Sequence, residues 1–567
     1  MQAVDGNAWK QNADAPGCLT GIFSILDKIP SRLRIRTCMN VKSFVSTTSL
    51  LAIAATFSSP LQADVKPNPL FTDGAVLQRG QAVPVWGSAR DGEKVTVEIG
   101  DQKVSTTAAN GKWSVELKPL KEGEALTMKI TGDNTVTINN LLVGEVWVCS
   151  GQSNMEWKFA QSHNAKEEGP KANYPKIRMF TVKKTTSTKP LTEADGSWVE
   201  CSPQTVGGFS AVGYFFARDL HQKLGVPVGM IHTSWGGTPA QAWTSLEGFG
   251  DNPELKVYVD SANKKLSTYD AEVAAYPAQM EEFENKTKQW NETVGNAYKE
   301  TLKAWTEAAE QAKKAGQPQP PKPVPSTPQP KAPAKPEPGS GHPTALYNGM
   351  IAPIIPYAIK GAIWYQGESN AGQSKQYQTL FPAMIADWRG RWKQGDFPFF
   401  FVQIAPFKGQ PPEIREAQFL TLAKVKNTAM AVTTDVGNAN DIHPNQKEPV
   451  GQRLALAARA LTYGEKIEYS GPLYESMTVK DGKIVLSFKH VGGGLVAKDG
   501  ELKGFTIAGE DKKFVPAKAK IQGATIEVSA EGVADPKAAR YGWENVPDVN
   551  LYNKEGLPAS PFRTDVE

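Results

Sequence analysis

The sequence predicts an α/β protein in which a central layered core lies between two smaller β-rich parts. Between about residues 141 and 463, short apolar strands alternate with amphipathic helices, which is typical of a sheet covered by helices. On either side, at 64–140 and 464–567, strands of alternating polarity are separated by turn residues. With 567 residues, 40% of them hydrophobic and 22% charged, the chain is long enough for several domains.

The amino-terminal β-rich part, 64–140, is expected to resemble a small β-sandwich. Its strands are predicted at 82–87, 94–99, 112–117 and 126–130, with a turn at Asn110 and Gly111. Pro84 has no backbone N–H to donate, so the first of these strands is expected at a sheet edge. The carboxyl-terminal part, 464–567, is a second β-rich domain with strands at 483–488 and 525–528.

The core, 141–463, is predicted from four short apolar segments and the helices between or after them. The strands are expected at 225–231, 360–365, 399–404 and 429–432, and two of the helices at 211–224 and 451–461. An insertion at 254–338 interrupts this pattern. Residues 254–314 are charged and rich in Ala, Glu and Lys, which predicts one or two exposed helices. The Pro-rich tract that follows, 318–338, has little to bury and is expected to be an extended or disordered spacer.

The amino end has the pattern of a secretory signal. Met39 and Lys42 precede an apolar run at 44–57, and small residues before Ala63 resemble a cleavage site. We expect 39–63 to be a signal peptide, 1–38 to be an over-extended start, and the protein to be exported to the periplasm or beyond. Cys149 and Cys201 then remain in the mature chain, and both a bridge and packed free thiols stay open.

Composition argues against several classes of partner. The 63 basic and 59 acidic residues give a net charge of +4 without a Lys/Arg block, so nucleic acid is not expected as a partner. After the signal no apolar run reaches the length that spans a membrane. The chain has no CxxC or HExxH pattern and no cluster with zinc-ligand spacing, so neither a metal nor another cofactor is expected.

A serine at the end of a predicted strand is the first candidate for chemistry. The apolar run 141–148 stops at the polar, glycine-containing segment 149–155, which holds Ser153. A strand that breaks into such a turn presents a serine at the edge of a sheet, as α/β enzymes present a nucleophile. The alternative is a structural role for Ser153 as the N-cap of the next helix.

A serine nucleophile needs a base, and the chain has six histidines. His443 follows the strand at 429–432 and precedes a helix, with Asp441 two residues before it. That carboxylate could bond one ring nitrogen and leave the other for the serine proton. A loop histidine beside a turn aspartate explains the same residues, and His232, at the end of another strand, is a second candidate for the base.

Two further strand ends carry groups suited to an oxyanion hole and to substrate contacts. The segment 232–239 contains Gly236 and Gly237, which let a backbone approach a ligand closely, although a plain turn explains them equally. The segment 366–370 offers Gln366 as first and Asn370 as second amide donor, with Glu368 orienting a neighbour or contacting substrate; a polar helix-capping loop is the alternative. Four such segments after four strands indicate an active site, because open α/β sheets bind ligands at this edge.

These motifs resemble the sialate O-acetylesterase family of the SGNH hydrolases. The resemblance rests on residues 151–155, 235–237, 364–370 and 441–444 and covers nearly the whole mature chain. It implies a flavodoxin-like core flanked by the β-rich domains, a serine–histidine mechanism without a metal, and removal of acetyl groups from sugar hydroxyls. The implied partner is an O-acetylated sugar or glycan, first of all an acetylated sialic acid. An acetyl esterase acting on xylan or pectin and a non-catalytic glycan-binding protein are the alternatives, and the oligomeric state is open.

By the same resemblance, Ser153 is the nucleophile and His443 the base. The backbone N–H of Ser153, with that of Gly236 or Gly237, supplies the oxyanion donors. The expected substrate-binding residues are Gln152, Asn154, Glu368 and Asn370.

Two positions depart from the usual SGNH pattern. Asn440 stands where an aspartate precedes the histidine by three residues, so Asp441 is the expected orienting acid and Asp435 a reserve candidate. In the third sequence block of the SGNH hydrolases, the usual asparagine is replaced here by a Gln-Gly-Glu pattern. Gln366 is therefore the candidate third oxyanion donor.

Overall fold

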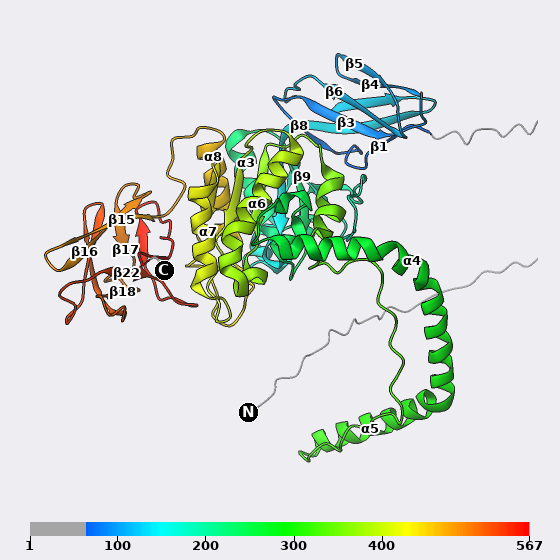
Figure 1. The fold of residues 1–567 in the computed structure, drawn as a ribbon. Helices are drawn as coiled ribbons and strands as arrows, with labels where there is room; N and C mark the ends of the chain where they lie inside the picture. The colour runs from blue at the N-terminus through cyan, green and yellow to red at the C-terminus, as the bar shows by residue number, and fades with distance from the viewer. Residues whose placement is uncertain (1–63, 566–567) are drawn as a thin grey trace, which may run out of the picture. The chain divides into compact units, whose positions relative to one another are not determined.

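One long strand, β8 (Thr135–Gly151), is shared by the amino-terminal β-rich part and the central sheet (Figure 1). The computed structural model describes residues 64–565. The predicted start at Met39 and the predicted signal peptide at 39–63 lie outside the described residues. Because β8 runs without a break through residues 140 and 141, no linker separates the two parts at this point.

The central sheet confirms the predicted α/β class. Its strand order is β10-β9-β11-β8-β12-β13-β14, and all neighbours except β10 and β9 are parallel. The five strands from β11 to β14 have the chain order 2-1-3-4-5, one of the orders of doubly wound sheets. Besides β8, the sheet consists of β9 (Tyr174–Thr181), β10 (Trp198–Cys201), β11 (Val228–Ser234), β12 (Gly361–Tyr365), β13 (Phe399–Val402) and β14 (Thr428–Ala431).

Helices cover both faces of this sheet, which explains why its strands are nearly continuous apolar runs. Trp147 and Cys149 of β8 pack in a cluster with α3 (Ala211–Leu224) and α8 (Glu448–Leu461). Val146 and Val148, which alternate with them, belong to the cluster formed with α6 (Ser374–Trp392) and α7 (Pro412–Lys424). Successive side chains of a strand point to opposite faces, so one apolar run serves both clusters.

The amino-terminal part consists of two sheets around a shared apolar core. The first contains β1 (Lys66–Pro67), β3 (Val83–Ser88) and β6 (Lys112–Leu117). The second joins β8 through β7 (Leu126–Thr131), and also contains β2 (Val76–Gln78), β4 (Lys94–Ile99) and β5 (Gln102–Thr107).

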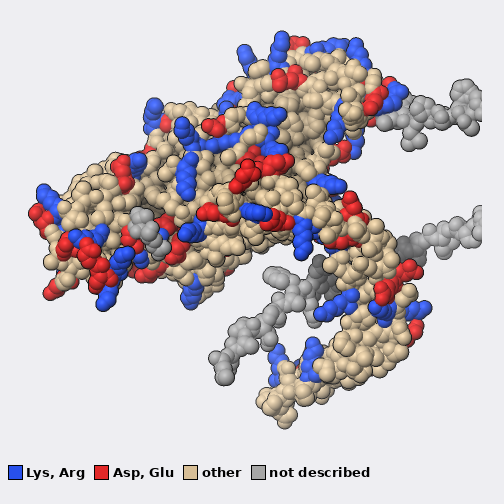
Figure 2. All heavy atoms as spheres, viewed as in Figure 1, with Lys and Arg blue, Asp and Glu red and all other residues tan. Residues whose placement is uncertain are grey.

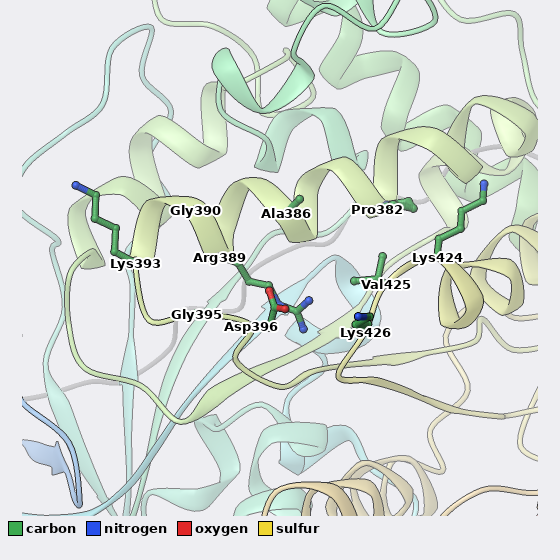
Figure 3. Close-up of a pocket in the computed structure, with 10 residues that line it drawn as sticks. All are labelled: Pro382, Ala386, Arg389, Gly390, Lys393, Gly395, Asp396, Lys424, Val425 and Lys426. Atoms are coloured by element: carbon green, nitrogen blue, oxygen red, sulfur yellow. The ribbon is translucent and has the colours of Figure 1, made fainter.

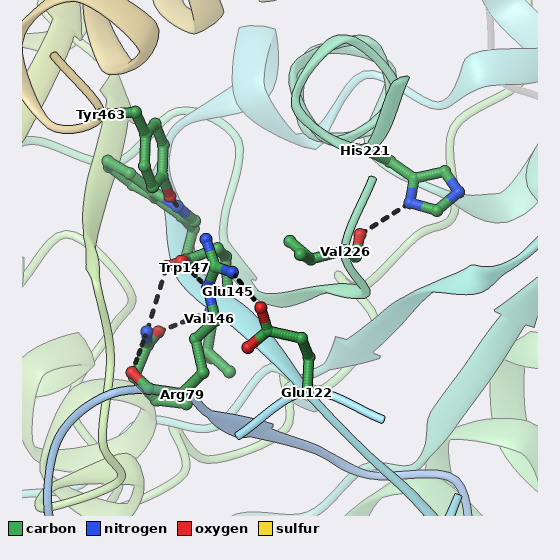
Figure 4. Close-up of polar contacts among 9 residues, drawn as sticks. Arg79, Glu122, Glu145, Val146, Trp147, His221, Val226 and Tyr463 are labelled. Atoms are coloured by element: carbon green, nitrogen blue, oxygen red, sulfur yellow. Dashed lines mark hydrogen bonds and ion pairs between the residues drawn. The ribbon is translucent and has the colours of Figure 1, made fainter. Parts of the chain in front are cut away.

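A buried carboxylate fixes the point at which β8 enters the central sheet (Figure 4). Glu145 is 1% exposed and accepts hydrogen bonds from Arg79 Nε at 2.6 Å and Gln78 Nε2 at 3.0 Å. The Gln78 Oε1 atom in turn accepts from the Val146 N–H at 2.8 Å. A carboxylate buried in this way is stable only when it is paired, so these contacts tie the two parts together.

The carboxyl-terminal part has its own apolar core. One sheet contains β15 (Leu473–Lys480), β16 (Lys483–Lys489), β20 (Lys518–Gln522) and β21 (Thr525–Ser529). A second contains β18 (Phe505–Ala508), β19 (Val515–Pro516), β22 (Ala538–Tyr541) and β24 (Phe562–Arg563), and β17 (Leu495–Ala497) pairs with β23 (Leu551–Asn553).

The insertion consists of two helices and an irregular return segment. The helices are α4 (Lys256–Trp290) and α5 (Asn296–Lys314), joined by a π-helical turn at Asn291–Gly295 (Figure 1, green). The return segment 317–338, here called the proline-rich strap, has no regular secondary structure. Trp290, Tyr298 and Trp305 donate side-chain hydrogen bonds of 2.9–3.1 Å to its carbonyl oxygens. The strap is therefore held against the helices.

Cys149 and Cys201 are free and buried, and two strands lie between β8 and β10 in the sheet, a separation of roughly 14 Å that no disulfide spans. Within 64–565, none of the helices combines the length and the apolar character required to cross a bilayer.

Candidate active site

Three of the four predicted segments start at the same edge of the sheet. In the parallel register Gly151 of β8 lies opposite Ser234 of β11 and Tyr365 of β12. The residues that follow, Gln152, Trp235 and Gln366, therefore leave the sheet side by side. This is the carboxyl edge, where open α/β sheets bind ligands.

Gly151 allows the serine turn to leave the sheet in close contact with β12. Its φ is +137°, and a Cβ atom at this position would lie 2.2 Å from the Tyr365 carbonyl oxygen. Any side chain would collide with this backbone, so only glycine fits. The Gln152 N–H then donates to the same oxygen at 3.0 Å.

Ser153 is the first residue of the short helix α1 (Ser153–Glu156), and Gln152, not Ser153, is in the N-cap position. The Ser153 Oγ atom lies 2.8 Å from His443 Nε2. Trp157 stacks on the imidazole with ring centroids 5.6 Å apart and planes inclined by 20°. The structure therefore brings together the predicted nucleophile and the predicted base, with one face of the base held by an aromatic ring.

Asp441 lies beside His443. Its Oδ1 accepts the His443 backbone N–H at 2.8 Å and lies 3.7 Å from the ring Nδ1. This second distance exceeds a normal hydrogen bond, so in this structure Asp441 fixes the loop and acts on the ring through its charge. Asp435, the reserve candidate, instead pairs with Arg453 through contacts of 2.8 and 2.6 Å. Asn440 is exposed and accepts a hydrogen bond from Lys408.

His443 has an environment that favours its neutral form. Partial burial lowers the pKa of His443 below its ordinary value, the Asp441 charge raises it, and the Lys447 charge lowers it. A histidine must be neutral to accept a proton from a serine, so a lowered pKa suits a base.

His232, the second candidate base, is placed elsewhere. It lies within β11, where its Nε2 is 2.6 Å from Ser234 Oγ. Burial lowers the pKa of His232 to about 4. The structure does not bring this histidine to Ser153.

The two candidate oxyanion glycines differ in what their N–H groups contact. The Gly236 N–H donates to Glu156 Oε2 at 2.7 Å. A Cβ on Gly236 would lie 3.2 Å from Ser153 Cβ, so this loop passes close to the nucleophile. Among the described residues no acceptor is found for the N–H groups of Gly237 or Ser153. Gly237 has a φ of +74°, which a glycine adopts without strain.

Gln366 and Asn370 are buried, and their side-chain amides are hydrogen-bonded to each other. Gln366 Nε2 donates to Asn370 Oδ1 at 2.7 Å and to the Thr238 carbonyl at 3.3 Å. Asn370 Oδ1 also accepts the Ala240 N–H at 2.9 Å. Both amides thus hold the segment after Gly237, and the Gln366 amide nitrogen has no hydrogen left for a substrate oxygen.

The other three predicted substrate-contact residues form a second buried network. Gln152 Oε1 accepts the Ser369 N–H at 3.2 Å. Asn154 Nδ2 donates to Glu368 Oε1 at 2.6 Å and to the Ile442 carbonyl at 3.1 Å. Burial raises the pKa of Glu368, and its Oε2 atom is buried with no partner in the described part of the chain. These contacts link the serine turn, the segment after β12 and the histidine loop.

Sequence reasoning missed two charged residues of the site. Lys447 is 1% exposed and donates from Nζ to Asn154 Oδ1 at 2.5 Å. Glu156 connects the serine helix to Gly236 and pairs with Lys184 at 2.6 Å. Glu156 lies within three residues of the predicted nucleophile, which was a usable signal. The only sequence signal for Lys447 was its position four residues after His443.

An open surface pocket of about 760 Å³ elsewhere on the α/β core is not part of this site (Figure 3). It is lined by residues of α6 and of the segments before β13 and β14, at the opposite, amino-terminal edge of these strands. Figure 3 shows Lys393 and Lys424 pointing apart, and the Arg389 guanidinium is already occupied by the Phe397 and Asn427 carbonyls. The Asp396 carboxylate lies beside that guanidinium, so these charged groups already face each other within the protein.

The fold and the site together indicate a class of protein. A serine in hydrogen-bond contact with a histidine, at the carboxyl edge of a parallel sheet, is the arrangement of α/β serine hydrolases. The comparisons with known proteins specify the family.

A family model described as carbohydrate esterase, sialic acid-specific acetylesterase, matches residues 143–276 and 338–460. The chain is 30% identical to the mouse sialate O-acetylesterase, over 69% of this chain and 72% of the mouse protein. It is 29% identical to the rat sialate O-acetylesterase, over 84% of this chain and 90% of the rat protein. Among solved structures, a carbohydrate acetylesterase from Xanthomonas citri matches with 34% identity and a TM-score of 0.72, over 89% of this chain and all of that one.

The chain therefore belongs to the sialic acid-specific acetylesterase family of carbohydrate esterases, as the motifs indicated. Membership makes it a carboxylic-ester hydrolase.

Proposed function

We propose that this protein removes acetyl groups from sugar hydroxyls by nucleophilic catalysis at Ser153. The observation that carries the proposal is the 2.8 Å contact between Ser153 Oγ and His443 Nε2. A serine is a weak nucleophile until a neighbouring base accepts its proton, and His443 is placed to do so. Family membership supports an acetyl ester as the substrate.

The proposed reaction uses these two side chains in turn. Ser153 Oγ attacks the acetyl carbonyl carbon as His443 Nε2 accepts the hydroxyl proton. His443 then protonates the departing sugar alkoxide and leaves an acetyl-enzyme. In the second half, His443 accepts a proton from water, the hydroxide attacks the acetyl carbonyl, and acetate leaves as Ser153 recovers its proton.

We propose the backbone N–H groups of Ser153 and Gly237 as the main oxyanion donors, because neither has another acceptor in the described residues. Gly236, whose N–H is bonded to Glu156, then holds the loop against the serine turn. Asp441 is the proposed orienting acid, since its carboxylate is the one beside the His443 ring. Hydrogen bonds in a free enzyme can be long and shorten when substrate binds.

We further propose that the core is a flavodoxin-like SGNH hydrolase domain spanning 141–463, with the helical and Pro-rich insertion 254–338 and with β-rich domains at 64–140 and 464–567. The strand order 2-1-3-4-5 and the strand-end position of Ser153 support this class. Gln152, Asn154, Glu368 and Asn370 are proposed to support the site, because each makes hydrogen bonds within the protein, Gln152 and Glu368 through one oxygen atom each.

Acetylated sialic acid is the first proposed substrate, because the mammalian relatives are sialate O-acetylesterases. The solved relative is named more broadly, as a carbohydrate acetylesterase. Acetate release should therefore be measured on O-acetylated sialic acids, acetylated xylan and acetylated pectin fragments side by side. A rate on sialic acids no higher than on the plant glycans would contradict the sialate assignment while leaving the esterase chemistry intact.

Ser153→Ala tests the chemistry itself. We expect acetate release to fall by at least about 10⁴-fold, because no other group in the site replaces the nucleophile. Far-ultraviolet circular dichroism and the melting temperature should match those of the wild type. A folded variant that retains acetate release would show that another residue carries the reaction.

We propose that the protein is exported and that it acts on extracellular or periplasmic glycans rather than on nucleic acid or in a membrane. Intermixed Lys, Arg, Asp and Glu side chains on the visible face, without a basic band, support the choice of partner (Figure 2). Amino-terminal sequencing of the protein from the culture fluid or periplasm should give Asp64 as the first residue. An intact terminus upstream of Met39 would contradict export through this signal.

A further inference from the structure

A buried lysine lies within the hydrogen-bond network that surrounds the Ser153–His443 pair. Lys447 is 1% exposed, although lysine side chains are almost never fully buried without a partner. Its ammonium group lies over the faces of two aromatic rings, 5.1 Å from the Tyr365 centroid and 5.7 Å from the Trp157 centroid. Negative ring faces stabilise a cation in this position.

The hydrogen bonds of Lys447 lead to both halves of the site. Its Nζ donates to Asn154 Oδ1 at 2.5 Å, which leaves the Asn154 Nδ2 hydrogens for two other acceptors. These acceptors are Glu368 Oε1 at 2.6 Å and the Ile442 carbonyl at 3.1 Å. Asn154 directly follows the nucleophile and Ile442 directly precedes the base. One amide therefore connects the serine turn to the histidine loop, and Lys447 fixes the orientation of that amide.

The same network contains two buried charges of opposite sign. Glu368 is 8% exposed, and Asn154 lies between its carboxylate and the Lys447 ammonium. A buried carboxylate without a compensating charge is costly, so the lysine also stabilises the ionised form of Glu368. The Trp157 ring lies against both the Lys447 ammonium and the His443 ring, so one indole contacts the cation and the imidazole.

We propose that Lys447 is a positioning residue of the ester-hydrolysis site: it orients Asn154, and through Asn154 it holds Ser153 and His443 in register and balances the buried Glu368 carboxylate. This role rests on the proposed serine mechanism. Lys447 does not touch the acetyl group. It acts on the rate because the geometry of the nucleophile and base depends on the amide that it holds.

The charge of Lys447 also acts on His443. The charged groups that face His443 are Asp441, which raises its pKa, and Lys447, which lowers it, besides the lowering by burial. Burial lowers the pKa of Lys447 itself to about 7, against the opposing effects of Glu368 and Asp441. Removing the lysine charge should therefore raise the pKa of His443 and move the acidic limb of kcat/KM to higher pH.

Lys447→Met removes the charge and the donor while keeping an unbranched chain. We expect kcat for acetate release to fall by about 100-fold, the scale of a misplaced catalytic group, with KM changed less than about 3-fold. The acidic limb of the pH profile should shift upward. Lys408→Met is the matched control: it removes an exposed lysine that contacts the same loop through Asn440, and its kcat and pH limb should stay at the wild-type values.

The double variant Lys447→Met/Glu368→Gln removes both buried charges and keeps an amide oxygen for Asn154. It should melt at a higher temperature and have a higher kcat than Lys447→Met, because no unpaired carboxylate remains. Equal kcat and an unshifted limb in folded Lys447→Met would overturn the proposal, as would the absence of rescue. Failure of both variants to fold would overturn it too, since Lys447 would then be a folding residue.

Ser153→Ala, measured in the same assay, separates the two levels. If Ser153→Ala retains activity, the proposed serine mechanism is wrong. If Ser153→Ala is inactive and Lys447→Met is unaffected, only the proposed role of Lys447 is wrong.

Discussion

At the residue scale, the geometry of the Asp441–His443 contact determines how strongly the carboxylate supports the proposed base. Asp441 accepts its shortest hydrogen bond, 2.8 Å, from the His443 backbone N–H, and its Oδ1 lies 3.7 Å from the ring Nδ1. Asp441 is also exposed, so solvent weakens its charge. Its contribution should be smaller than that of a buried triad aspartate bonded directly to the ring.

Asp441→Asn tests this contribution. The Asp441 charge raises the pKa of His443, so its removal should lower that pKa and move the acidic limb of kcat/KM to lower pH. We expect kcat to fall by about 10- to 100-fold, compared with ~10⁴-fold for a fully hydrogen-bonded triad aspartate. The comparison variant is Asp435→Asn, which loses its pair with Arg453 and should lower the melting temperature without moving the limb. The opposite pattern would assign the orienting role to Asp435.

Residue by residue, the sequence predicted the pair that the structure brings into contact, Ser153 and His443, but not the side chains that support this pair. Ser153 and His443 follow strand ends, and strand ends can be located from apolar runs along the chain. Lys447 and Glu156 belong to the site through contacts made across it, to Asn154 and to the Gly236 N–H. The position of Glu156 near Ser153 was a signal, but neither contact partner could be read from the sequence. Gln366 was expected to face a substrate, but burial directs its amide to Asn370 instead. Polar residues beside a proposed catalytic serine can hydrogen-bond to the surrounding loops as well as to a ligand.

At the scale of elements, the register of three strands brings the site together. The Gly151 position in β8 requires a bare backbone, because a Cβ would lie 2.2 Å from the Tyr365 carbonyl oxygen of β12. The prediction for Pro84 shows the limit of reasoning from one residue. β3 is the middle strand of its sheet, yet β1 pairs only with Gly87 and Ser88, so Pro84 sits where one side of the strand has no partner. Proline therefore does occupy a position without a partner on one side, although the prediction that the whole strand lies at a sheet edge was wrong.

Gly151→Ala tests the register. The added methyl group collides with a backbone oxygen and meets a φ of +137°, so we expect a loss of about 3 kcal/mol or more in the free energy of unfolding. Gly390→Ala is the control, because this exposed position in α6 has no atom within 4 Å of the added Cβ. It should stabilise the protein by up to about 1 kcal/mol. Chemical denaturation of both variants gives the comparison, and a mild effect of Gly151→Ala would contradict the close approach.

At the scale of the whole molecule, the family model covers the α/β core and leaves out most of the insertion. The family model matches residues on both sides of 277–337 and omits this stretch. The α/β core could be predicted because periodicity and strand ends carry it. The path of the proline-rich strap could not, since a proline tract offers carbonyl oxygens but few N–H donors to a neighbour. Its partners are the side-chain donors of Trp290, Tyr298 and Trp305, which are scattered along the helices.

Trp305→Ala should therefore release the strap without changing the chemistry. Its indole N–H donates to the Pro320 carbonyl at 2.9 Å, and Lys322 of the strap lies over its ring at 5.8 Å. We expect faster proteolysis within 317–338, with kcat and KM for acetate release unchanged. Thr306→Ala is the matched control, because that hydroxyl bonds within α5, to the Leu302 carbonyl. Equal cleavage rates in the two variants would mean that the strap is held by contacts other than Trp305, whereas a change in kcat would mean that the strap acts on the catalytic site from outside the family-wide core.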